Sequence, residues 1–146
     1  MKNSRGLLAV LSVISIAAIA LGIFTYVHRA VSEQVYAYNC GIVDYKPVSI
    51  LKSCGDARVG VVDLQWDTWG ADGATGVGQY WINPCKPDCA QGKLQYADVK
   101  VKLSASVVDK GKKVLSQIEL ITADGKKLPL HPTASDSWIL ESKPLP

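Results

Sequence analysis

The sequence predicts an all-β domain, a small antiparallel β-sandwich or barrel, behind one N-terminal transmembrane helix. Three observations support this fold class: a long uncharged apolar segment near the start of the chain, period-two alternation of apolar and polar residues further on, and turn residues between the alternating segments. No segment after residue 30 has a clear helical period. The 117 residues from 30 to 146 are enough for one domain with a hydrophobic core.

Residues 7–27 form the predicted transmembrane helix. These 21 positions carry no charge, and a helix of that length spans about 31 Å, which matches the hydrocarbon thickness of a bilayer. Lys2 and Arg5 directly precede this segment, whereas only Arg29 and His28 directly follow it, so the positive-inside rule places residues 1–6 in the cytoplasm. We therefore expect a single-pass protein of the plasma membrane whose C-terminal domain is extracytoplasmic.

A cleaved signal peptide is the alternative for the N-terminal segment. Small residues at 18–20 resemble a cleavage site, but the apolar run continues for seven more positions, and signal peptides usually have a shorter apolar core. An uncleaved anchor fits better, and both alternatives export the same domain. Ala18 and Gly22 lie four residues apart on one face of the helix, where small side chains permit close packing against another membrane protein.

The exported part has a predicted order of segments. Residues 28–38 are a short tether or the first strand, residues 39–125 are a disulfide-stapled β domain, and residues 126–146 are a Pro-rich C-terminal extension with at most one edge strand. Val62, Leu64 and Trp66 alternate with polar residues and are expected on one buried face. The expected strands lie near residues 35–40, 47–53, 59–67, 76–82, 97–107 and 113–122.

The charge of the exported part is balanced overall and divided along the chain. Beyond residue 29 there are 13 basic and 13 acidic residues, so the net charge of +3 comes from the region next to the membrane and does not indicate nucleic-acid binding. Residues 30–92 carry 4 basic and 7 acidic groups, a net −3, whereas residues 93–127 carry 8 basic and 4 acidic groups, a net +4. The domain is therefore bipolar.

Cys40, Cys54, Cys85 and Cys89 all lie in the exported part, where an even number of cysteines in a small domain predicts disulfides. A zinc site or a redox pair would need two-residue spacings that this sequence lacks, so we expect no metal and no cofactor. Three pairings are possible, and the spacing alone does not choose among them. Local pairing, 40 with 54 and 85 with 89, is marginally preferred, whereas pairings between the halves would close longer loops and stabilise by roughly 3–4 kcal/mol each.

Three motifs in series resemble a group of small exported actinobacterial proteins of uncharacterised function. The segments Leu64-Gln65-Trp66-Asp67-Thr68-Trp69-Gly70, Ala74-Thr75-Gly76-Val77-Gly78 and Cys85-Lys86-Pro87-Asp88-Cys89-Ala90-Gln91-Gly92 are similar to the patterns LxWxxWG, AxGxG and CxPxCAxG. The resemblance covers residues 47–103, slightly over a third of the chain. It implies an exported β domain and carries no assigned activity or catalytic residue.

Trp69 and a group of lysines are the candidate binding residues. Trp69 is expected on the face opposite Trp66 or in the following turn, where it either covers the Cys85–Cys89 loop or presents a platform to a sugar ring or partner. The lysines fall on one hairpin and either protect a sheet edge or form a basic face for anionic lipid, an acidic polymer or an acidic partner. These lysines are Lys100, Lys102, Lys110, Lys112 and Lys113.

The remaining patterns do not indicate catalysis. The glycines of residues 70–78 precede a predicted strand and not a helix, so nucleotide binding is not expected, and no carboxylate spacing matches a calcium loop. The exported part has one histidine, His131, and no serine in a nucleophile-elbow context. The sequence thus favours an interaction or structural module, such as an accessory subunit of a larger membrane complex. The alternatives are a glycan or peptidoglycan binder and, last, an envelope enzyme with an unrecognised carboxylate pair.

Overall fold

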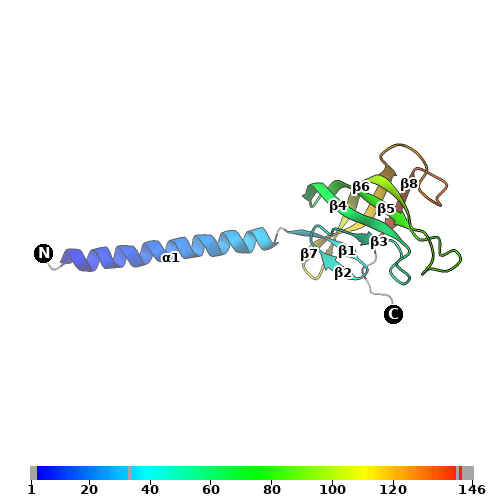
Figure 1. Cartoon of the computed structure of the whole chain (residues 1–146). Coiled ribbons are helices and arrows are strands. Elements are labelled where there is room, and N and C mark those ends of the chain that lie inside the picture. Colours follow the sequence, from blue (N-terminus) through cyan, green and yellow to red (C-terminus); the bar gives the residue numbers. More distant parts are fainter. Residues whose placement is uncertain (1–2, 33, 141, 143–146) are drawn as a thin grey trace. The chain divides into compact units, whose positions relative to one another are not determined.

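The computed structural model describes residues 3–32, 34–140 and 142 (Figure 1). The chain divides into two compact units, Met1–Gln34 and Val35–Pro146. The first contains α1 (Asn3–Ser32), in which Leu11–Arg29 has a mean hydropathy of 1.9 and is long and apolar enough to cross a membrane, a property that signal sequences share. Residues 28–32, in the segment predicted as a tether or first strand, continue the helix, and the first strand begins at Val35. Parts of the predicted segments 1–6 and 126–146 lie outside the described residues.

The second unit is an all-β domain, as predicted, built from one sheet that curls into a half-barrel (Figure 1). Its strands are β1 (Val35–Asn39), β2 (Ile42–Asp44), β3 (Ile50–Leu51), β4 (Val59–Gly70), β5 (Gly73–Ile82), β6 (Gln95–Asp109), β7 (Lys112–Thr122) and β8 (Ser135–Ile139). The strand order is β2-β1-β7-β6-β5-β4-β3, and β8 pairs with the later part of β7. The pairs are antiparallel except β1 with β7, which is parallel and departs from the all-antiparallel expectation.

The core lies on the inner face of the long strands β4 to β7. Alternate residues of these strands point inward and are almost completely shielded from solvent, as the period of two requires. The Pro-rich extension also contributes to this core, because Leu128 and Leu140 are 2% and 4% exposed. The segment is therefore an integral part of the domain and supplies β8. The strand residues of the core include Val61, Leu64, Tyr80, Val99, Val101, Leu103, Leu115, Ile118 and Leu120.

β4 departs from simple alternation at two bulges. Asp63 has φ +53° and the pairing with β5 shifts there, so the buried residues are Val61 and Leu64, while Val62 is half-buried. The prediction that Val62 shares the face of Leu64 is therefore wrong. A second shift follows Trp66 and brings Trp66 and Trp69 to the same face. Each extra residue reverses which face the rest of the strand presents.

The two edges of the curled sheet are joined by side chains and a disulfide. The Asn39 amide nitrogen donates to the Ser49 carbonyl oxygen at 2.9 Å, and the Leu51 backbone N–H donates to the Asn39 side-chain oxygen at 3.3 Å. The Cys40–Cys54 disulfide links the same two segments. The predicted strand at 47–53 is thus mainly an irregular connection, of which only β3 pairs with β4.

Candidate binding groove on the sheet

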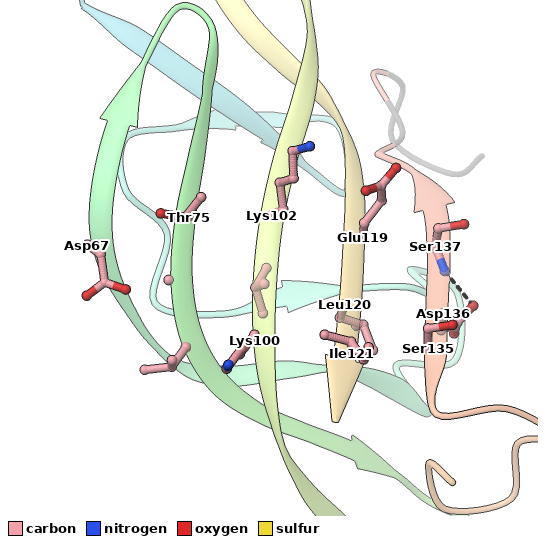
Figure 2. Close-up of a pocket in the computed structure, with 13 residues that line it drawn as sticks. Asp67, Thr75, Lys100, Lys102, Glu119, Leu120, Ile121, Ser135, Asp136 and Ser137 are labelled. Carbon is pink, nitrogen blue, oxygen red and sulfur yellow. Dashed lines mark hydrogen bonds between the residues drawn. The ribbon is translucent and has the colours of Figure 1, made fainter. Parts of the chain in front are cut away.

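A groove with a volume of about 770 Å³ crosses the outer face of β4 to β8 (Figure 2). Its first row of side chains is polar, because Thr75, Lys102, Glu119 and Ser137 are successive partners across β5, β6, β7 and β8. The Thr75 hydroxyl lies 2.8 Å from the Thr68 hydroxyl on β4, which extends the row to a fifth strand. Lys102 and Glu119 face one another as an oppositely charged cross-strand pair.

The second row mixes aliphatic and charged side chains. Val77, Lys100, Ile121 and Ser135 are successive partners across the same four strands. Val77 and Ile121 are 44% and 50% exposed, which is unusual for aliphatic residues in the middle of long strands. Asp67, on β4, completes the rim. The structure therefore brings the two predicted lysines of β6 together between aliphatic and acidic neighbours.

The chemistry of this groove suits hydrogen bonding, ion pairing and aliphatic contact. The described residues that line it include two lysines, three acidic residues and three hydroxyl side chains, with no aromatic ring among them. One of the acidic residues, Asp136, accepts a hydrogen bond from the Ser137 backbone N–H at 2.8 Å (Figure 2). Its carboxylate also accepts a hydrogen bond from the Lys52 ammonium. A surface without rings provides no stacking platform for sugars, whereas it can complement an extended polypeptide.

Lys112 and Lys113 lie apart from this groove, so the predicted basic face is divided. They are at the beginning of β7, whereas the partners of Lys100 and Lys102 are near its end. Lys113 lies six positions before Glu119 and eight before Ile121, the partners of Lys102 and Lys100, so the two groups are about 20 to 26 Å apart along the strand. The Lys112 ammonium lies 4.9 Å from the centroid of the Tyr36 ring. One hairpin thus carries two separate basic regions.

Trp69 has a structural environment that neither sequence-based interpretation described. Its indole N–H donates to the Val35 carbonyl oxygen at 2.8 Å, and its ring centroid lies 4.9 Å from that of Trp66 and 6.1 Å from that of Tyr45. The side chain is half-buried and lies at the end of β4 opposite the Cys85–Cys89 loop. Trp69 nevertheless lines a second concavity of about 370 Å³, together with Thr68, Asp72, Thr75 and Lys102.

The four cysteines form Cys40–Cys54 and Cys85–Cys89, the local pairing. In the chain-entropy account, closing the loops between these residues, 14 and 4 positions apart, stabilises the domain by about 3 and about 2 kcal/mol. Asn83 organises the shorter loop by donating to the Cys89 carbonyl oxygen and accepting from the Cys85 N–H, both at 2.9 Å. Among the described residues, no group of three His, Cys, Asp or Glu side chains could hold a metal ion.

Lys52, His131 and the buried Asp136 form a partly buried charge cluster that no sequence pattern indicated. The Asp136 carboxylate, 8% exposed, lies 2.5 Å from the Lys52 ammonium and 3.8 Å from the His131 ring. Burial and, secondarily, the Asp136 charge raise the pKa of Tyr80. The Lys52 ammonium also lies 5.3 Å from the Trp138 ring centroid. Because 84 positions separate Lys52 from Asp136, no local pattern could indicate this pair, which ties β8 and the groove wall to the segment after β3.

Ala18 and Gly22 both lie on α1, and their packing against another helix stays a prediction. Ala18 and Gly22 are exposed, and a Cβ added at Gly22 would meet no atom within 4 Å.

Comparisons with protein-family models, with curated proteins and with solved structures find no match to this chain.

Proposed function

We propose that this protein is a single-pass, membrane-anchored extracytoplasmic interaction module that binds a polypeptide segment of another membrane protein in the groove on β4 to β8. Such a role is that of an accessory subunit in a larger membrane complex. The observation that carries the proposal is the surroundings of two neighbouring lysines on the exposed face of β6. Lys100 lies between the exposed aliphatic residues Val77 and Ile121, and Lys102 lies between Thr75 and Glu119. The length and apolarity of Leu11–Arg29 support a membrane anchor. The basic residues Lys2 and Arg5 before the apolar residues 7–27, against Arg29 directly after them, support a cytoplasmic N-terminus.

The groove chemistry specifies the kind of partner segment. Two lysines one strand repeat apart would meet carboxylates of similar spacing on an extended chain, and Val77 and Ile121 would meet its aliphatic side chains. Glu119 and Asp67 flank the lysines and would exclude a uniformly acidic polymer. On α1, Ala18 and Gly22 would let a helix of the same partner pack closely.

Site-specific photo-crosslinking tests this proposal. A p-benzoylphenylalanine residue in place of Ile121 should crosslink in intact cells to one membrane protein, which should also co-purify with the wild-type chain in mild detergent. Lys100→Glu with Lys102→Glu should abolish both signals by reversing the groove charge. The matched control, Lys93→Glu with Lys127→Glu, changes two exposed lysines outside the groove. This control should retain both the crosslink and the co-purification. Recovery of the wild-type protein only as a free monomer would contradict the proposal.

A second candidate function, binding of cell-envelope glycan or peptidoglycan, is favoured by the concavity at Trp69. A partly exposed aromatic ring beside Asp72, Thr68 and Lys102 is a combination that can bind a sugar. Pull-down on purified cell wall distinguishes the two functions. Trp69→Ala and Asp72→Ala should both lower retention if glycan binds there, and retention equal to wild type for both variants would exclude this function. Lys100→Glu alone, which leaves Lys102 in place, should not alter glycan retention.

A further inference from the structure

The end of the β domain at which the chain arrives from α1 carries a cluster of lysines. Val35, the first residue of β1, pairs in parallel with Lys113 of β7. The β6–β7 turn lies at the same end, with Lys110 and Gly111 at φ +47° and +78°, a two-residue turn that makes the hairpin tight. Lys110, Lys112 and Lys113 are exposed and surround this turn. The hairpin tip is defined here as residues 107–113.

The same tip exposes aliphatic side chains on both faces of the strand. Val108 is 75% exposed and Val107 is 40% exposed, although neighbouring residues of a strand point to opposite sides. The tip therefore extends beyond the core. An exposed aliphatic pair flanked by three lysines is the composition of a surface that meets lipid headgroups and the upper part of the acyl region.

Two tyrosines lie on one side of the tip and add to this interfacial composition. The Tyr36 ring lies under the Lys112 ammonium and 6.3 Å from the Tyr45 ring, and the Lys46 ammonium lies 5.7 Å from Tyr45. Tyrosine and lysine together are typical of the membrane–water interface. One acidic residue, Asp109, lies within the tip opposite Lys112, so the tip keeps a positive charge. Further acidic side chains at this end of the domain are Asp44 and Asp72.

We propose that the hairpin tip docks on the anionic surface of the bilayer that holds α1, with the lysines on lipid phosphates and Val108 between headgroups. This inference rests on the proposed anchor and is independent of the groove. The covalent link supports it, because the chain from Ser32 to Val35 spans at most about 11 Å and Val35 is paired directly to Lys113. Each lysine that reaches the anionic surface in the docked state raises the ratio of docked to undocked states by about fivefold.

Hydrogen exchange of the full chain in nanodiscs tests the docking. Nanodiscs of phosphatidylcholine alone are compared with nanodiscs that contain equal amounts of phosphatidylglycerol. The amides of residues 107–113 should exchange more slowly in the anionic nanodiscs, and added salt should remove the difference. The amides of β5 should exchange equally in both. Failure of the chain to enter nanodiscs would overturn the anchor and this inference together.

Charge reversal provides the decisive comparison. Lys110→Glu, Lys112→Glu and Lys113→Glu combined should lower the docked ratio by at least 100-fold and abolish the lipid-dependent protection. The control, Lys93→Glu with Lys127→Glu, changes lysines near the other end of the long strands and should retain the lipid-dependent protection of the tip. A chain that enters nanodiscs normally but shows the same exchange of the tip in both lipids would overturn the docking and leave the groove proposal unaffected.

Discussion

Replacing Trp69 separates a structural role for this side chain from a role confined to ligand contact. Trp69→Ala removes about 100 Å² of buried ring surface, worth roughly 2.5 kcal/mol, and an edge-to-face contact with Trp66 worth about 1 kcal/mol. It also removes the hydrogen bond to the Val35 carbonyl oxygen, worth about 1 kcal/mol. The free energy of unfolding should therefore fall by about 4 kcal/mol. Trp69→Phe keeps most of the ring contacts and should cost about 1–2 kcal/mol.

Pulse proteolysis of the full chain in mild detergent, over a series of urea concentrations, measures these differences without relying on tryptophan fluorescence. Ile139→Ala provides the control, because Ile139 is 75% exposed and its loss should change the free energy by less than about 0.5 kcal/mol. A Trp69→Ala variant as stable as this control would refute the reasoning. Equal losses for Trp69→Phe and Trp69→Ala would show that the hydrogen bond, and not ring packing, dominates.

Three further predictions concern the charge cluster, a bulge and alkaline pH. Lys52→Met leaves the Asp136 carboxylate without its partner and should lower the free energy of unfolding, measured in urea, by about 2 kcal/mol. This is less than for a fully buried pair, because the lysine is 33% exposed. The double variant Lys52→Met with Asp136→Leu should recover part of the lost stability. Gly76→Ala would force a Cβ against the Gln65 carbonyl oxygen and should lower the thermal midpoint, at a cost of about 1–3 kcal/mol. Because folding raises the pKa of Tyr80, the stabilisation from its protonated hydroxyl is fully present below the usual pKa of 10.0 and is lost as the pH rises through the pKa in the folded state. In a series of unfolding measurements at increasing pH, Tyr80→Phe should therefore show a smaller decline in stability than the wild type.

The candidate groove was only partly predictable. Lys100 and Lys102 stand out in the sequence because they alternate with buried valines, and the structure places both on the exposed face. Their partners Glu119 and Ser137 come from strands whose register is not encoded locally, since each depends on pairing across the whole sheet. Ser137 also lies in a Pro-rich segment that resembles a loop, although Leu140 of the same segment is buried in the core.

The sequence by itself determined the long apolar helix, the all-β class of the domain and the tight turn at Lys110–Gly111, because these depend on local composition, periodicity and backbone preference. The tertiary structure alone decided which side chains share a surface. The bulge at Asp63 reversed the buried face of β4, a second shift set Trp69 against Trp66, and distant segments formed the Lys52–Asp136 pair. A single inserted residue changes the face of every residue beyond it, and that choice is made by packing between strands rather than by any one strand.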